Sequence, residues 1–146
     1  MRICFVCLGN ICRSPMAEFI MKDKVNKLGI SDKFIIESRA TSDEEEGNDM
    51  YPPAKRMLEE KSIPYTRHYA KRVEEADYDK FDLFICMEEA NIRNLKYIFE
   101  DTDRKVIKLL DKDISDPWYT GNFISTYNDL VEGIDKLLKN VNKDVN

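Results

Sequence analysis

The chain lacks the features of a membrane protein, a secreted protein or a nucleic-acid-binding protein. Among its 146 residues no apolar run approaches the roughly 20 residues that span a bilayer. It has no long basic block, and 28 acidic against 23 basic side chains give a formal net charge of −5, which argues against a nucleic-acid partner. The start is too short an apolar stretch for a signal peptide, so we expect a cytoplasmic protein that is not bound to a membrane.

The sequence also lacks internal repeats and low-complexity linkers, so we predict one globular domain over residues 1–146. A chain of this length buries a core without disulfide or metal staples. Thiols stay reduced in the cytoplasm, so clustered cysteines are more typical of catalysis or metal binding than of a structural role. Three of the four cysteines lie in "CFVCLGNICRS", residues 4–14.

The apolar pattern predicts strands that alternate with helices. The first strand, 2–6, leads through a loop into a helix that Ser14 could cap and Pro15 could open. Further strands are predicted over 34–38, 81–87 and 105–110, helices over 53–61, 88–99 and 123–141, and irregular loops over 41–53 and 111–122. The fold class is therefore α/β, a doubly wound four-stranded parallel sheet with helices on both faces. Ligands of such folds bind beyond the carboxyl ends of the strands, where the first loop lies.

Cys4 and Cys7 form a Cys-x-x-Cys pair, which raises two alternatives. A structural zinc site needs two more ligands, and Cys12, Cys86 and His68 do not make a second spaced pair. A thioredoxin-type pair opens a helix, whereas Cys4 lies inside the predicted strand. A nucleotide-binding loop is excluded because no Gly-Lys-Ser/Thr follows.

A third interpretation starts from Cys7, the first residue after the strand. The residues that follow turn back to a helix start, so their N–H groups can converge on a phosphate-sized anion. The same field favours a thiolate, which is the nucleophilic form of cysteine. Arg13 supplies a two-pronged donor for phosphate oxygens. Gly9 and Asn10 tolerate positive φ, and the Ser14 hydroxyl could donate to the sulfur.

The segment "VCLGNICRSPMAE" resembles the signature of the low-molecular-weight protein tyrosine phosphatases, and the likeness continues in "SRATS", "HYAKR", "CMEEANIRNL" and "DPWY". The resemblance implies a four-stranded parallel sheet with five helices, and hydrolysis of phosphotyrosine in two steps through a phosphocysteine on Cys7. Neither a metal nor an organic cofactor is implied. Expected substrates are phosphotyrosine-containing proteins or small aryl phosphates, and we expect a monomer. The loop residues expected to bind substrate are Leu8, Gly9, Asn10, Ile11, Cys12 and Ser14.

A departing phenolate needs a proton, and Asp116 in "DPW" is the candidate donor. The adjacent proline and tryptophan could hold a carboxylic acid near the phosphate and keep it protonated. From the residues alone Asp111 and Asp113 are rivals, and the resemblance favours Asp116, which would also activate water in the second step. Trp118 and Tyr119 could form a wall of the slot for the aryl ring, or pack in the core.

The resemblance bears on three further residues. Cys12 stands where the family has a second cysteine that can form a disulfide with the nucleophile, and its alternative role is packing under the loop. His68 would brace Ser14, or be a structural histidine. Glu44, within the acidic run 43–46, stands where many members carry an aromatic residue of the slot. It would favour substrates with basic or neutral residues beside the phosphotyrosine, unless this run is simply a solvated loop.

The sequence lacks features that other functions of related proteins require. Bacterial protein-arginine phosphatases resemble this sequence but carry threonine where Ile11 stands, and an apolar rim suits a phenyl ring. Arsenate reductases need extra downstream cysteines, whereas only Cys86 follows the loop. A phosphate-binding module without turnover would be favoured by loss of Cys7, Arg13 or Asp116, and all three are present. A receiver-like domain needs an acidic pair after the first strand.

Overall fold

The chain forms one sheet of four parallel strands in the order β2-β1-β3-β4, in a computed structural model that describes residues 1–145. The strands are β1 (Arg2–Cys7), β2 (Ile35–Ala40), β3 (Leu83–Cys86) and β4 (Val106–Lys108). The register pairs Cys7 with Ala40 and Val6 with Cys86, so the carboxyl ends of the three longest strands meet at one edge. The predicted fold class is confirmed.

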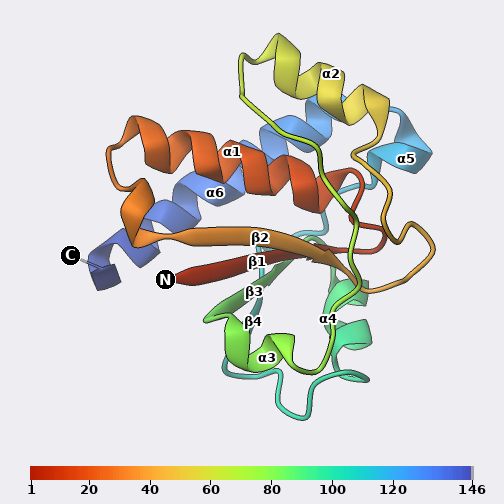
Figure 1. Cartoon of the computed structure of the whole chain (residues 1–146), viewed down its shortest axis with the longest axis vertical. Coiled ribbons are helices and arrows are strands. Elements are labelled where there is room, and N and C mark those ends of the chain that lie inside the picture. Colours follow the sequence, from red (N-terminus) through yellow and green to blue (C-terminus); the bar gives the residue numbers. More distant parts are fainter. Residues whose placement is uncertain (146) are drawn as a thin grey trace.

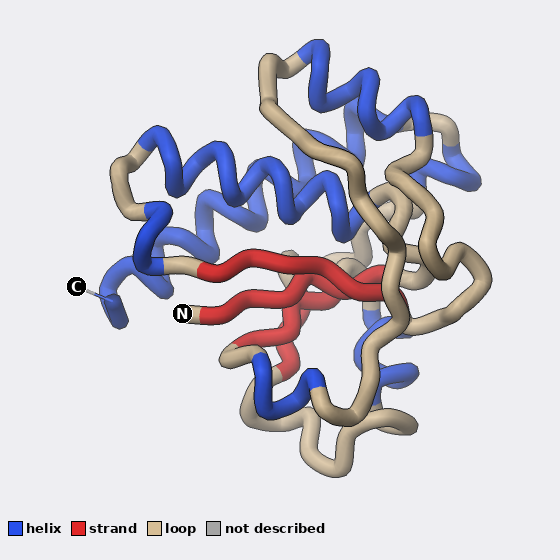
Figure 2. The backbone as a smooth tube through the Cα atoms, in the orientation of Figure 1, coloured by secondary structure: helices blue, strands red, loops and turns tan. Residues whose placement is uncertain are grey.

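Helices cover both faces of this sheet. α1 (Arg13–Lys27), α2 (Pro52–Glu60) and α6 (Phe123–Val145) lie on one side, and α3 (Asp77–Lys80) and α4 (Glu89–Leu95) lie on the other (Figure 1). A short α5 (Pro117–Thr120) precedes α6, and a 3-10 turn (η1, Ser31–Lys33) leads into β2. The described residues thus form six α-helices, one more than the resemblance implied, and two of them, α3 and α5, are single turns of four residues. Long loops join the strands to the helices at the carboxyl edge (Figure 2).

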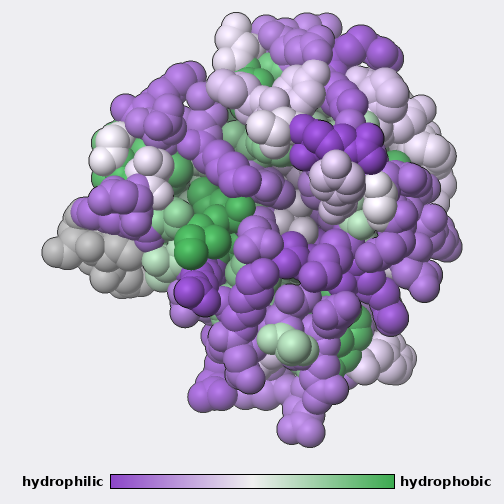
Figure 3. Space-filling model, in the orientation of Figure 1, coloured by the Kyte–Doolittle hydropathy of each residue, from purple (hydrophilic) through white to green (hydrophobic). Residues whose placement is uncertain are grey.

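The alternation of side chains along β1 divides the core between the two faces. Ile3, Phe5 and Cys7 belong to the larger cluster under α1 and α6, whereas Cys4 and Val6 belong to the smaller one beside α4. Burial of these apolar side chains is the main stabilising contribution to the fold. The face of the molecule in Figure 3 is mostly hydrophilic, apart from hydrophobic side chains beside the start of β2.

Most predicted boundaries were wrong by one or more residues; the strand predicted over 81–87, for example, spans Leu83–Cys86. β4 is shorter than 105–110 because Leu109 and Leu110 leave the sheet and pack in the larger core cluster. α4 ends at Leu95 rather than at residue 99. Ser14 does not cap α1, which begins one residue earlier, because its hydroxyl contacts the sulfur of Cys7 instead.

No helix within residues 1–145 combines the length and the apolar character that a membrane crossing requires.

Candidate active site

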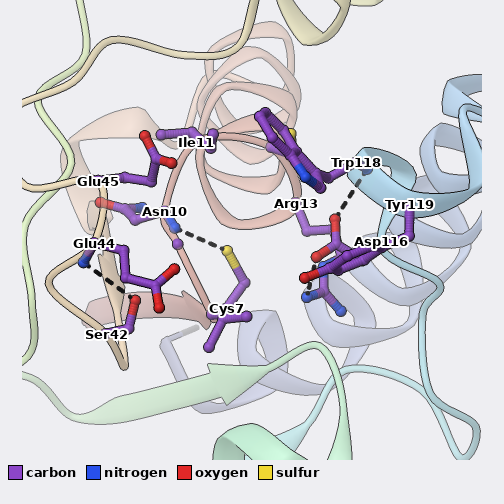
Figure 4. Close-up of a pocket in the computed structure, with 13 residues that line it drawn as sticks. Cys7, Asn10, Ile11, Arg13, Ser42, Glu44, Glu45, Asp116, Trp118 and Tyr119 are labelled. Atoms are coloured by element: carbon purple, nitrogen blue, oxygen red, sulfur yellow. Dashed lines mark hydrogen bonds and ion pairs between the residues drawn. The ribbon is translucent and has the colours of Figure 1, made fainter.

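A pocket of about 470 Å³, including its open mouth, lies at the carboxyl edge of the sheet (Figure 4). Its lining comes from the loop after β1, the loop after β2 and the start of α5: Cys7, Leu8, Gly9, Asn10, Ile11, Cys12, Arg13, Ser42, Glu44, Glu45, Asp116, Trp118 and Tyr119. Every residue that the sequence analysis placed in the site lies here except Ser14, which is fully buried against Cys7. Sequence analysis missed Ser42 and Glu45.

Two hydrogen-bonding groups contact the sulfur of Cys7. The backbone N–H of Asn10 donates to Cys7 Sγ at 3.3 Å, and the Ser14 hydroxyl lies 3.0 Å from the same atom. Because Ser14 Oγ already accepts a bond from Asn10 Nδ2 at 2.7 Å, its own hydrogen can point at the sulfur. The N-terminus of α1 also faces this loop, so the surroundings of Cys7 stabilise a negative charge.

Asn10 holds the loop in shape. It adopts a left-handed backbone conformation with φ of 61° and is fully buried. Its Nδ2 donates to Ser14 and to Ser38 Oγ at 3.0 Å, while its Oδ1 accepts a bond from Lys71 N. Asparagine tolerates this conformation better than most residues, and its amide bonds to partners from three separate segments. The loop is therefore preorganised by its own side chain.

His68 supports the loop through Asn10 rather than through Ser14, contrary to the expectation. Its Nε2 lies 2.8 Å from the carbonyl oxygen of Asn10, and since a carbonyl only accepts, this ring nitrogen carries the proton. Burial lowers the pKa of His68, although the bond to Asn10 and the charges of Glu18 and Asp49 oppose this effect. The buried ring is thus held neutral.

Arg13 links the loop to the candidate acid. Its side chain is almost completely buried, with Nη1 donating to the carbonyl oxygen of Ile114 at 2.9 Å. Nη2 lies 3.3 Å from both Glu88 Oε1 and Asp116 Oδ2. Burial alone would lower the pKa of Arg13, but the negative charges of Cys7, Asp116 and Glu88 outweigh it and the pKa is raised. The guanidinium is therefore a fixed positive charge at the pocket.

Asp116 is the N-cap residue of α5. Its Oδ1 accepts the backbone N–H of Trp118 at 3.1 Å, and its Oδ2 faces Arg13. The two rivals lie elsewhere: Asp111 is exposed outside the pocket, and Asp113 pairs with Lys108 at 2.8 Å. The hydrogen bond from Lys108 lowers the pKa of Asp113, which keeps it a carboxylate. Of the three acids, only Asp116 shares the pocket with Cys7.

The other cysteines differ from Cys7 in their surroundings. Cys12 lines the pocket but is buried, and burial together with the negative charge of Cys7 raises the pKa of its thiol. Cys4 and Cys86 lie in the smaller core cluster, and burial raises the pKa of both. All four cysteines are free thiols. The surroundings therefore favour Cys7 over the others as the reactive sulfur.

The mouth of the pocket has an aromatic side and an acidic side. The side chains of Trp118 and Tyr119 are 52% and 77% exposed, which argues against a role in core packing. Glu44 and Glu45 lie across the pocket from them (Figure 4). Neither glutamate forms a salt bridge with a basic side chain in the part of the chain that the structure describes. The mouth is therefore apolar on one side and negative on the other.

Within the described residues, no group of three or more histidine, cysteine or acidic side chains is arranged to hold a metal ion. The expectation that catalysis needs no metal stays a prediction.

A cysteine sulfur contacted by a backbone N–H and a hydroxyl, beside an arginine and an acid at the carboxyl edge of a parallel sheet, is typical of cysteine-dependent phosphatases. The family model described as low molecular weight phosphotyrosine protein phosphatase matches residues 2–146. The chain therefore belongs to the low molecular weight protein tyrosine phosphatases, as the sequence motifs predicted.

Individual relatives agree with this assignment. The chain is 35% identical over 150 residues to the low molecular weight protein-tyrosine-phosphatase PtpA of Staphylococcus epidermidis, covering 99% of this chain and 96% of that one. A low molecular weight protein tyrosine phosphatase from Streptococcus pyogenes superposes with a TM-score of 0.88 at 39% identity, covering 95% and 91% of the two chains. A Drosophila arginine phosphatase superposes with a TM-score of 0.87 at 25% identity, covering 97% and 98%.

Proposed function

We propose that the chain hydrolyses phosphotyrosine through a phosphocysteine on Cys7, with Arg13 and the loop N–H groups binding the phosphate and Asp116 acting as general acid and base. The observation that carries the proposal is the shared pocket, in which Arg13 connects the loop of Cys7 to Asp116 through a 3.3 Å ion pair. Nucleophile, charge stabiliser and acid thus face the same space.

In the first step the Cys7 thiolate attacks phosphorus, and the bond from phosphorus to the phenolic oxygen breaks. Asp116 acts here in its protonated form, with the phosphate in place of its carboxylate as the anion that faces Arg13, and it gives its proton to the departing oxygen, which leaves as a neutral phenol. Negative charge on the phosphoryl oxygens is stabilised by Arg13 and by the N–H groups of the loop. The bond from Arg13 to Ile114 supports this role, because it fixes the guanidinium before substrate arrives.

In the second step water attacks the phosphorus of the phosphocysteine and the bond from sulfur to phosphorus breaks. Asp116, now a carboxylate, takes the proton from the water. The sulfur leaves as a thiolate, and the Ser14 hydroxyl at 3.0 Å stabilises the charge that develops on it. Inorganic phosphate is released and the enzyme returns to its starting state.

The expected substrates are phosphotyrosine-containing proteins or small aryl phosphates. Ile11 and the exposed ring of Trp118 support this choice, because they offer apolar surface to a flat phenyl ring. Glu44 and Glu45, which form no salt bridge within the described residues, support a preference for basic or neutral residues beside the phosphotyrosine. We further infer a monomer that acts in the cytoplasm, where the thiol of Cys7 stays reduced.

Arginine phosphatase activity is the second candidate, because the Drosophila arginine phosphatase shares the fold. The apolar side chain of Ile11 at the pocket argues against it, since it offers nothing to polarise water towards a phosphoguanidinium group.

The test is phosphate release from a phosphotyrosine peptide and a phosphoarginine peptide of the same sequence, with chelator and reductant present. Cys7→Ser serves as the blank. We expect turnover of the phosphotyrosine peptide alone, lost in the variant. Faster turnover of phosphoarginine would overturn the substrate assignment, and release by Cys7→Ser at the wild-type rate would overturn the mechanism.

A further inference from the structure

Three aromatic rings from separate elements meet beside the pocket. The Tyr51 ring, just before α2, packs edge to face on Trp118 of α5, with centroids 4.7 Å apart and an interplanar angle of 67°. On its other side it lies parallel to the ring of Phe123, the first residue of α6, at 6.2 Å and 2°. Tyr51 is therefore the middle ring that joins the exposed wall of the pocket to the body of the molecule.

Tyr51 is also attached to the phosphate-binding loop. Its backbone N–H donates to the carbonyl oxygen of Ile11 at 2.9 Å, and its side chain packs against the larger core cluster. The wall at Trp118 and the loop around Cys7 thus share one support. A change at Tyr51 that keeps its backbone N–H removes the link to the wall and leaves the link to the loop.

The wall depends on this support because little else fixes it. Trp118 is 52% exposed and belongs to a helix of four residues that ends at Gly121 with φ of 71°. Within residues 1–141, the ring of Tyr51 makes the one aromatic contact with Trp118. Across the pocket stands Glu44, which offers no aromatic surface. Between Trp118 and Glu44, only Trp118 offers aromatic surface to a substrate ring. The affinity of the site for that ring therefore depends on how firmly Trp118 is held in place.

We propose that Tyr51 is a positioning residue for recognition of the aryl group: it orients the ring of Trp118 against the aromatic ring of the substrate. An ordered wall loses less conformational freedom when the substrate binds, so affinity for an aryl ligand is higher. Aromatic contacts of this geometry correspond to about two- to tenfold in affinity. The inference rests on the proposed function and extends it to a residue outside the pocket lining.

The experiment compares wild type with Tyr51→Leu, which loses the ring, and Tyr51→Phe, which keeps it. Trp118 is the single tryptophan of the chain, so intrinsic fluorescence reports on the wall directly. Two ligands are titrated: phenylphosphonate, which carries a ring, and inorganic phosphate, which does not. Tyr97→Leu is a matched control, because Tyr97 is 89% exposed after α4. Thermal unfolding of each variant verifies that it is folded.

We expect Tyr51→Leu to lower the fluorescence anisotropy of Trp118 and to weaken phenylphosphonate binding by about three- to tenfold, with the dissociation constant of phosphate changed less than about twofold. Tyr51→Phe restores the wild-type values, and KM for phenyl phosphate follows the phosphonate. Equal weakening of both ligands, or unchanged phosphonate binding, would overturn the inference. If Tyr51→Leu does not fold, Phe123→Leu replaces it, because Phe123 stacks on the ring of Tyr51. Phenylphosphonate binding is then expected to weaken as well. Failure of the proposed function differs from these outcomes, because wild type would then show no turnover.

Discussion

The loop from Cys7 to Ser14 and the rim of the pocket are built in opposite ways. In the loop Asn10, Arg13 and Ser14 are buried, and their polar groups bond to distant segments. At the rim Glu44 and Trp118 are exposed and have few partners. A buried network has one arrangement, because any unpaired group in it costs free energy. The loop is therefore suited to the reaction that the proposal assigns to it, and the rim to the choice of substrate.

The largest effect is expected where the two regions meet, at Asp116. Asp116→Asn removes the proton donor but keeps a side chain that can accept the N–H of Trp118. We expect kcat to fall by about 10²- to 10⁴-fold for phenyl phosphate, whose leaving group needs protonation. The fall should be much smaller for 4-nitrophenyl phosphate, whose leaving group is stable as an anion. Asp113→Asn is the matched control, and an equal loss for both substrates would refute the acid role.

Asn10→Ala tests the loop side of the comparison. The substitution removes bonds to Ser14, Ser38 and Lys71 and places alanine at φ of 61°. We expect a loss of about 2–4 kcal/mol in the free energy of unfolding, measured by urea denaturation, together with a lower kcat. Asn128→Ala, on the exposed side of α6, should change neither quantity. Wild-type stability in Asn10→Ala would show that the loop does not depend on its buried network.

The pH dependence of stability tests a further part of the buried network, the ring of His68 that contacts the loop at Asn10. Because burial lowers its pKa in the folded state, the unfolded chain takes up a proton more readily. Stability from this group is complete above the unfolded pKa of about 6.5 and declines as pH falls below it. We expect the free energy of unfolding to decrease from pH 7.5 to pH 5.5, and to decrease less in His68→Gln. If the free energy of unfolding changed equally with pH in both proteins, His68 would not contribute to this pH dependence.

The smallest effect is expected at the acidic rim. Glu44→Gln with Glu45→Gln should lower kcat/KM for a peptide with lysine beside the phosphotyrosine by about two- to fivefold at low salt. The difference should shrink at high salt, because exposed charges are screened. Glu60→Gln, exposed on α2, is the control. An effect that persists in high salt would point to direct contact rather than to the field of the rim.

The sequence allowed prediction of the parts that are local along the chain. The order of strands and helices follows from apolar periodicity. The residues from Cys7 to Arg13 are consecutive in the sequence, and all of them line the pocket. Its partners could not be predicted in this way. Glu88 and Tyr51 reach the site from distant elements, and Tyr51 lies in a segment expected only to be an irregular loop. Their roles depend on tertiary packing, which spacing along the chain does not reveal.

The central claim is that Cys7 carries the phosphoryl group, and the most direct test is to find it there. Wild type, Cys12→Ser and Cys7→Ser would be mixed with a phosphotyrosine peptide, quenched rapidly in acid and analysed by peptide mass spectrometry. The account predicts one phosphoryl group on the Cys7 peptide in wild type and in Cys12→Ser, and neither adduct nor turnover in Cys7→Ser. A phosphoryl group on any other residue, or turnover without Cys7, would contradict it.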